Sequence, residues 1–156
     1  MGLFGVKEKS FASLGGAVEI ALTSEWKSGS EDNALVLWRK GGTSTLRISV
    51  LTFEAAGGDA DSSIPPPGMN KQAEQHSVQI TPYPSGGFYI YYFEDLVEDG
   101  VPIRQFTWQV SRFVDGGTWN LAIVTFTMDT ADMDLPDIRA DLAKVQQEVM
   151  RLRWRT

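Results

Sequence analysis

The sequence contains no cysteine, a single histidine and no long hydrophobic run. Without cysteine the chain cannot form a disulfide, a thiol nucleophile or a Cys-ligated zinc site. No stretch approaches the roughly 18 consecutive apolar residues of a membrane-spanning helix, so we expect no membrane span. The N-terminal residues lack the order of a secretory signal, in which basic charge precedes a continuous apolar run. These features together predict a cytoplasmic protein.

Basic residues are also scarce. The chain has 14 Lys and Arg against 20 Asp and Glu, which gives a net charge of −6. A general nucleic-acid binder needs a concentrated basic surface to neutralise phosphates, so we expect no nucleic-acid partner. The 156 residues, of which 42% are hydrophobic and 22% charged, are enough for a globular domain with its own core. We therefore predict a single domain over residues 1–156.

Alternation of apolar and polar residues dominates the chain and predicts β-strands. The predicted strands are 18–22, 34–39, 45–53, 77–81, 88–93, 102–113 and 118–127. Short Gly-containing spacers at 40–44 and 115–117 indicate hairpins. Apolar and aromatic residues on both faces of 88–93 indicate a central strand that is covered on both sides. This order predicts an antiparallel meander of about six to seven strands.

The stretch 54–76 interrupts the pattern with small and polar residues and three consecutive prolines, Pro65 to Pro67. Proline cannot donate to a strand ladder, so regular pairing is excluded there. A long irregular loop in a compact domain is usually functional or poorly ordered, whereas surface loops also tolerate plain insertions. We expect an irregular loop with a short helix near 69–75, and both interpretations of its role stay open.

The C-terminal stretch 135–153 has apolar residues at helical spacing, namely Leu135, Ile138, Leu142, Val145, Val149 and Leu152. Their steps of three and four residues place them on one stripe of an amphipathic helix. Asp134 is expected at the N-cap and Pro136 in the first turn. The basic tail 151–155 would oppose the negative end of the helix dipole, or contact an acidic partner. The predicted class is α+β, a sheet packed by one long C-terminal amphipathic helix.

Such a sheet is wider than its helix. Seven strands span roughly 30 Å at about 4.8 Å per strand, whereas a helix is about 10 Å across and covers two or three strands. Another part of the chain, or another chain, must cover the rest of the apolar face. We expect this cover from the N-terminal segment around Leu3, Phe4 and Phe11, from the 54–76 loop, from closure into a barrel, or from a partner chain.

The aromatic residues exceed what one helix can hide, because the chain contains 5 Trp, 4 Tyr and 8 Phe. Exposed apolar patches on soluble proteins tend to mark interaction sites. We therefore predict that part of the sheet is a binding face, and the residues that we assign to it are Trp38, Tyr89, Tyr91, Phe93 and Trp108.

Catalytic and metal-binding patterns are weak. His76 lies in the irregular stretch, where a lone histidine is usually solvated, and no Gly-x-Ser-x-Gly elbow accompanies it. The acidic stretches 59–63 and 129–137 resemble the opening of a calcium loop but lack Gly at loop position 6 and Glu at position 12. We therefore expect no catalytic residue, no metal and no cofactor.

The order of the predicted elements and two short motifs resemble the PsbP/DcrB-like superfamily. The motifs are Leu22-Thr23-Ser24-Glu25-Trp26-Lys27 at a strand end and Val149-Met150-Arg151-Leu152-Arg153 at the helix end. The resemblance implies an α/β/α sandwich that serves as an adaptor, accessory subunit or chaperone rather than as an enzyme. In one bacterial cytoplasmic branch such proteins are chaperones of type VI secretion effectors, usually homodimers that hold apolar effector segments in a groove of the sheet.

Two hypotheses for the function follow. The first is a non-enzymatic binding module, adaptor or chaperone-like, that holds an apolar peptide or protein partner on a sheet face, with a homodimer as one form. An acidic immunity-type or inhibitor-type protein is a variant of it, compatible with the net charge of −6. The second is a small-ligand carrier or an enzyme with a pocket under the 54–76 loop, near His76 and Asp59 or Asp61.

Overall fold

The computed structural model describes residues 7–39, 41–54, 64–66, 68–114 and 117–155. Within these residues ten strands and two α-helices confirm the predicted α+β class. The elements are β1 (Glu8–Ala12), β2 (Val18–Thr23), β3 (Trp26–Glu31), β4 (Ala34–Arg39), β5 (Thr45–Glu54), α1 (Met69–Gln75), β6 (Thr81–Pro82), β7 (Phe88–Glu98), β8 (Val101–Val114), β9 (Thr118–Asp129), the 3-10 helix η2 (Thr130–Asp132), α2 (Pro136–Val149) and β10 (Arg153–Trp154).

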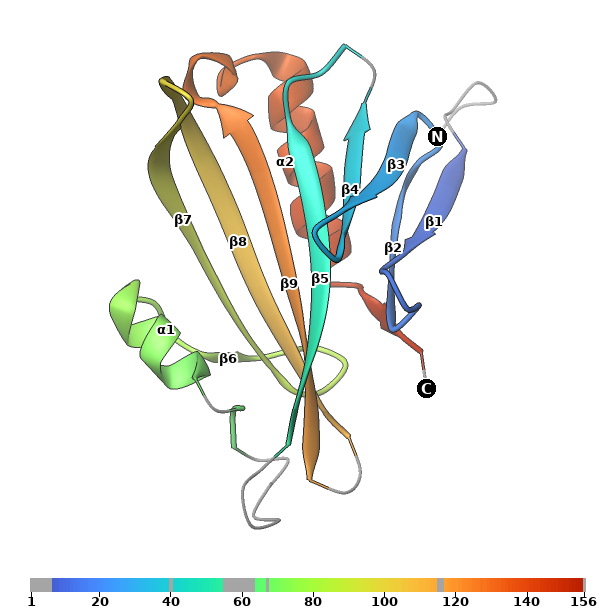
Figure 1. Cartoon of the computed structure of the whole chain (residues 1–156), viewed down its shortest axis with the longest axis vertical. Helices are drawn as coiled ribbons and strands as arrows, with labels where there is room; N and C mark the ends of the chain where they lie inside the picture. Colours follow the sequence, from blue (N-terminus) through green and yellow to red (C-terminus); the bar gives the residue numbers. More distant parts are fainter. Residues whose placement is uncertain (1–6, 40, 55–63, 67, 115–116, 156) are drawn as a thin grey trace.

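Seven strands form one antiparallel sheet in the order β3-β4-β5-β9-β8-β7-β6 (Figure 1). The meander is therefore broken once, because β5 pairs with β9 and not with a strand that follows it directly in the sequence. The long strands pair over most of their length, as β8 and β9 do from Ile103 opposite Asp129 to Val114 opposite Thr118. The prediction of a central strand at 88–93 is wrong, since β7 is the last long strand before the edge.

Three strands form a second, smaller antiparallel sheet in the order β1-β2-β10. The predicted strand 18–22 is confirmed as β2, but it belongs to this sheet. β10 brings the C-terminal residues beside it, with Arg153 opposite Glu19 and Trp154 opposite Val18. The small sheet lies next to α2, since β2 and α2 are in contact. The two elements together cover one face of the large sheet.

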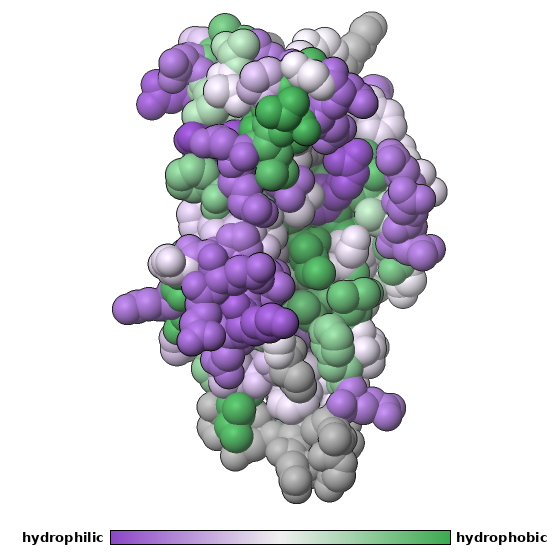
Figure 2. All heavy atoms as spheres, turned by 60° about the vertical axis from the view of Figure 1, so that its left-hand side comes forward, coloured by the Kyte–Doolittle hydropathy of each residue, from purple (hydrophilic) through white to green (hydrophobic). Residues whose placement is uncertain are grey.

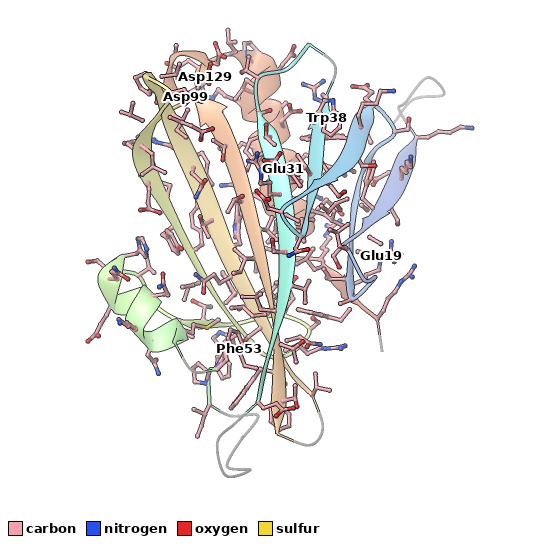
Figure 3. The ribbon with its side chains drawn as sticks, viewed as in Figure 1. Glu19, Glu31, Trp38, Phe53, Asp99 and Asp129 are labelled. Carbon is pink, nitrogen blue, oxygen red and sulfur yellow. The ribbon has the colours of Figure 1, made fainter. Side chains whose placement is uncertain are left out.

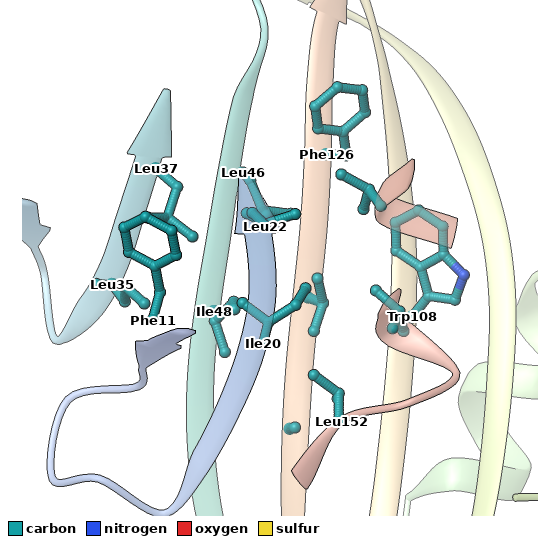
Figure 4. Packing of buried hydrophobic residues seen from close by; sticks show 14 of the residues in the cluster. Phe11, Ile20, Leu22, Leu35, Leu37, Leu46, Ile48, Trp108, Phe126 and Leu152 are labelled. Carbon is teal, nitrogen blue, oxygen red and sulfur yellow. The ribbon is translucent and has the colours of Figure 1, made fainter. Parts of the chain in front are cut away.

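The main core lies between this cover and the large sheet (Figure 4). Alternate residues of β5, β8 and β9 point into it and meet the inward side chains of β2 and α2, because strand side chains alternate between faces and helix side chains recur every three or four residues. Phe11 of β1 is 4% exposed, so the predicted cover by the N-terminal segment is confirmed at this residue. Leu3 and Phe4 lie outside the described residues.

The opposite face of the large sheet carries α1. Met69 and Ala73 of this helix are buried against Ile90 of β7 and Leu121 of β9. The predicted short helix near 69–75 is therefore confirmed, and it covers one part of this face. Residues 55–63 of the predicted loop lie outside the described residues.

The C-terminal helix is shorter than the predicted 135–153, because α2 ends at Val149 and the chain then turns into β10. Pro136 opens the helix as predicted, but Leu135 and not Asp134 is its N-cap. The basic tail, which we expected to oppose the helix dipole, begins with Arg151, and this residue pairs with Glu148 in the last turn of α2. Arg153 and Arg155 instead form ion pairs with Glu19 of β2.

Two further expectations need correction. The predicted strand 77–81 is reduced to Thr81 and Pro82 of β6, because Pro82 and Pro84 limit strand pairing there. The full α/β/α sandwich is not confirmed, since a three-stranded sheet shares one face with α2 and the short α1 lies on the other. In the described part of the chain, neither helix is long and apolar enough to cross a membrane.

Candidate functional site

In the described part of the chain, the outer edge of β7 has no strand partner over most of its length, although residues 78–80 pack beside its first part. β8 pairs with β7 from Phe88 to Glu98, whereas β6 pairs with it only at Phe88 and Tyr89. Among the described residues, Ile90–Glu98 therefore has no strand partner on the outer side. An open edge presents backbone N–H and C=O groups that another extended chain can pair with. We refer to Ile90–Glu98 as the β7 edge.

An aromatic patch lines one face of the sheet beside the β7 edge. Tyr91 stacks on Trp108 of β8 with ring centroids 5.1 Å apart, and Phe93 contacts Phe106 of β8 at 5.8 Å. The patch arises because alternate residues of β7 face the same way and lie opposite alternate residues of β8. Trp108 and Phe106 are buried, Tyr91 is half-buried and Phe93 is 49% exposed. Exposure therefore increases from β8 toward the β7 edge.

An open cavity of about 470 Å³ separates this patch from α2. Tyr89, Tyr91 and Trp108 form one wall, while Gln146 and Met150 come from α2 and the residue that follows it. Burial raises the pKa of Tyr91, with the hydrogen bond to Gln146 acting in the opposite direction. Tyr91 thus lines the cavity with a phenol that is hydrogen-bonded to Gln146 of α2.

Apolar residues are exposed where β7 ends and β8 begins. They are Phe93, Leu96, Val97 and Val101, of which Val97 is the most exposed at 71%. Arg104 of β8 lies over the ring of Phe93 at 4.3 Å and forms two hydrogen bonds with Asp95, at 2.8 and 3.0 Å. This contact lowers the pKa of Asp95 and holds Arg104 against the ring. Apolar surface on an edge strand marks a place where a partner can bind.

The β7 edge also has a polar side. Glu94 and Glu98 alternate with Phe93 and Val97, so the carboxylates point to the face opposite the aromatic patch. The aromatic side of the edge also carries Asp95, which is paired with Arg104, and the side of Glu94 and Glu98 also carries Tyr92 and Leu96.

Four of the five predicted binding residues lie together. Tyr91, Phe93 and Trp108 belong to the aromatic patch, and Tyr89 lines the adjoining cavity. Trp38 does not join them, because it lies on β4, separated from β7 by three strands, and on the opposite face (Figure 3). Its assignment to a binding site, like that of the other four, stays a prediction.

His76 has a structural neighbour that the sequence did not indicate. Its ring stacks on Tyr92 of β7 with centroids 3.6 Å apart and planes 7° apart, so the expectation of a merely solvated side chain is wrong. Asp59 and Asp61 lie outside the described residues. In the described ranges, no three His, Asp or Glu side chains gather closely enough to hold a metal ion.

Comparisons with known proteins identify the fold. No family model and no curated protein matches the sequence. A crystal structure of a protein from Bacteroides thetaiotaomicron VPI-5482 is similar to 95% of this chain, with a TM-score of 0.64 and 16% identity. This chain covers 48% of that protein, about half of its length.

Two other similar structures match over nearly their whole length. LpqN, involved in cell envelope biogenesis of Mycobacterium tuberculosis, has a TM-score of 0.59 at 6% identity, with 94% of this chain and 90% of LpqN covered. The Ran-binding protein Mog1p of Saccharomyces cerevisiae has a TM-score of 0.52 at 10% identity, with 96% of each chain covered. This chain has a fold similar to those of LpqN and Mog1p, which is consistent with the predicted resemblance to the PsbP/DcrB-like superfamily.

Proposed function

We propose that the protein is a non-enzymatic binding module that takes an extended segment of a protein partner as an additional strand along the β7 edge. The observation that supports this is the open edge Ile90–Glu98 with Phe93, Leu96 and Val97 exposed along it. In strand addition, backbone hydrogen bonds supply affinity, and alternate side chains supply specificity. The β7 edge offers both.

The chemistry of the two sides defines the partner. Residues of the added strand that face the aromatic patch would pack on Tyr91, Phe93 and Val97, so they should be apolar. The alternate residues would face Glu94, Leu96 and Glu98, so Lys or Arg opposite the two carboxylates would form cross-strand ion pairs. The proposed partner segment is therefore an extended stretch in which apolar and basic residues alternate. The cavity beside α2 can accept one larger apolar side chain.

The fold is compatible with such a role. Mog1p, which has a similar fold, is a Ran-binding protein, so at least one protein of this fold binds another protein. The adaptor or chaperone role implied by the resemblance, the cytoplasmic location and the homodimer stay predictions. A second copy of this chain could also add its own β7, but the acidic sides of two such edges would then repel each other.

The proposal can be tested with a designed peptide. The probe is fluorescein-labelled Val-Lys-Val-Lys-Val-Lys-Val, and its binding is followed by fluorescence anisotropy. The control peptide, Val-Val-Val-Val-Lys-Lys-Lys, has the same composition and charge without alternation. We expect the alternating peptide to bind at least tenfold more tightly, because only this order places valines against Phe93 and Val97 while its lysines lie on the side of Glu94 and Glu98.

A pair of matched variants locates the site. Val97→Ser removes exposed apolar surface from the β7 edge, and Leu135→Ser removes it from the 50% exposed Leu135 before α2. Loss of the Val97 contact should cost about 1 to 1.5 kcal/mol, roughly tenfold in Kd, while Leu135→Ser should leave Kd unchanged. Equal effects of the two variants, or equal binding of the two peptides, would contradict the proposal. A dimer in light scattering that Val97→Ser dissociates would identify a second copy as the occupant instead.

A further inference from the structure

We propose a second site on the opposite face of the large sheet, a cavity beneath α1 that binds a neutral small molecule with an apolar body and a hydrogen-bonding head group. The cavity has a volume of about 440 Å³ and lies on the other face of the sheet from the aromatic patch, and Tyr92 of the β7 edge is one of its lining residues. Ligand sites of drug-sized molecules usually have volumes of about 300 to 1,000 Å³. We refer to it as the α1 cavity.

One end of the α1 cavity is apolar. Its lining there consists of Phe53 of β5, Met69 of α1, and Leu121 and Ile123 of β9. Figure 2, in which the β7 and α1 side of the molecule comes forward, shows apolar atoms gathered between hydrophilic borders on both sides. Phe53 and Ile123 are only half-buried, so apolar area remains for a ligand to cover. This end can hold a flat apolar body.

The other end of the cavity is polar but uncharged. Gln105, Thr107 and Gln109 follow one another at alternate positions of β8, and Thr125 lies opposite Thr107 on β9. Gln109 donates a hydrogen bond to the Tyr92 hydroxyl at 3.3 Å. Tyr92 is in turn fixed by the stacked ring of His76. The polar end is therefore positioned by its neighbours before any ligand binds.

Thr107 is the residue that points most directly to a ligand. It is 3% exposed, and its hydroxyl oxygen is buried without a hydrogen-bond partner in the described part of the chain. A buried hydroxyl that makes no hydrogen bond is unfavourable, so such groups in proteins usually have a partner. A hydrogen-bonding group on a ligand in the cavity would satisfy it. Valine has the same shape and would avoid the cost if no partner were ever present.

The lining also defines the charge of the ligand. In the described ranges, no Asp, Glu, Lys, Arg or His side chain lines the α1 cavity. A charged ligand would lose hydration there without gaining an opposite charge, which is strongly unfavourable. The amide group of glutamine and the hydroxyl group of threonine can each donate and accept hydrogen bonds. These side chains therefore suit a carboxamide, a ketone or an alcohol on the ligand. The ligand class is therefore neutral.

The test uses two probes of equal shape. 2-Naphthamide is neutral, and 2-naphthoate carries a carboxylate on the same ring system. Binding is followed by NMR of protein labelled at the methyl groups of Met69 and Ile123. We expect 2-naphthamide to shift both methyl signals saturably and 2-naphthoate to bind at least tenfold more weakly. Absence of saturable shifts with 2-naphthamide, or equal binding of the two probes, would overturn the proposal.

The decisive variant is Thr107→Val, with Thr45→Val as its control. Thr45 is a half-buried threonine of β5 on the same face, outside the α1 cavity. Thr107→Val should weaken 2-naphthamide about tenfold through the lost hydrogen bond, yet its melting temperature should equal or exceed that of the wild type. Thr45→Val should leave the affinity unchanged. An unchanged affinity in Thr107→Val would overturn the proposal.

The two proposals can fail separately. Val97→Ser, which weakens the peptide at the β7 edge, should leave the 2-naphthamide affinity unchanged, because Val97 does not line the α1 cavity. The alternating Val-Lys peptide should not displace 2-naphthamide from Met69 and Ile123. If the peptide competes with 2-naphthamide for the cavity, the cavity accepts a peptide side chain, and the small-molecule proposal is wrong.

Discussion

The hydroxyl of Tyr83 holds the end of α2 to the segment that precedes β7. It donates a hydrogen bond to the backbone carbonyl of Val149, the last residue of α2, and accepts one from the N–H of Leu152 at 3.0 Å. Tyr83 is 3% exposed, so water does not replace these bonds. The side chain thus acts as a C-cap for a helix whose carbonyl groups have no intrahelical partner at this end. The hydroxyl should therefore contribute strongly to stability.

Tyr83→Phe removes one oxygen atom and leaves two buried backbone groups unsatisfied. A buried polar group that loses its partner costs about 1 to 3 kcal/mol, so the two groups set a range of about 2 to 6 kcal/mol. Local rearrangement of the turn at 150–152 will recover part of this. We expect a loss of about 2 to 3 kcal/mol in the free energy of unfolding, the lower end of that range.

The same hydroxyl makes the stability depend on alkaline pH. Burial raises the pKa of Tyr83 from its ordinary value of 10 to about 12, with the Leu152 N–H acting in the opposite direction. Because the pKa is higher in the folded state than in the unfolded state, the protonated Tyr83 hydroxyl contributes fully to stability below pH 10. This contribution to stability is lost as the pH rises from 10 to 12. Two pH units at 1.36 kcal/mol each amount to about 2.7 kcal/mol.

Urea unfolding at pH 8 and at pH 11.5, followed by tryptophan fluorescence, tests both effects. At pH 8 the wild type should exceed Tyr83→Phe by about 2 to 3 kcal/mol, and at pH 11.5 this difference should have largely disappeared. A variant within about 0.5 kcal/mol of the wild type at pH 8, or a difference that stays constant with pH, would refute the role assigned to the hydroxyl.

Two further predictions concern stability. Gly87→Ala should destabilise the protein by about 3 kcal/mol or more, because Gly87 has φ of +93° and an added Cβ would lie 2.0 Å from the carbonyl oxygen of Ser111. The control Gly100→Ala, at φ +79° in open space, should cost about 1 kcal/mol in thermal unfolding. Equal losses of stability in the two variants would contradict the clash with Ser111. Arg39→Met should lower the free energy of unfolding by about 2 to 3 kcal/mol, because it leaves the largely buried carboxylate of Asp141, 2.9 Å from Arg39, without its cation. The double variant Arg39→Met with Asp141→Leu should recover most of this loss in urea unfolding. A double variant as unstable as the single one would show that the carboxylate was not the cause.

Local periodicity explains which parts of the fold the sequence could predict. The long strands β8 and β9 and the helix α1 were predicted within about two residues, since alternation and helical spacing survive wherever a single core face decides the residue type. β3 was missed because Trp26 is its only buried residue, so Trp26–Glu31 carries no alternation. The short β10 was missed for another reason: its pairing with β2 depends on two segments at opposite ends of the chain. No local pattern encodes such a contact.

The candidate site, too, could be predicted only in part from the sequence. Tyr89, Tyr91 and Phe93 could be placed on one face by alternation, and Trp108 joined them through the register of β7 and β8. Trp38 has the same residue type but lies across the sheet, because residue type alone does not say which face or edge a strand occupies. The open edge is a property of strand order, and strand order depends on the pairing of β5 with β9. The sequence also showed aromatic residues on both sides of 88–93, which here reflects a strand with a cavity on each face.

The position of β7 between two cavities, one on each face of the sheet, connects the two proposed sites. Tyr91 faces the aromatic patch, and Tyr92, the next residue, lines the α1 cavity, so a ligand on either face contacts the same backbone segment. An added strand would fix the β7 edge, and a ligand against Tyr92 would fix it from the other face. Each should then favour the other, and thermodynamic linkage requires the same factor in both directions. We therefore expect saturating 2-naphthamide to tighten the alternating peptide by the factor by which saturating peptide tightens 2-naphthamide, and Tyr92→Leu to reduce both factors toward one. A peptide affinity that is unaffected by 2-naphthamide in the wild type would mean that β7 is already rigid without either ligand.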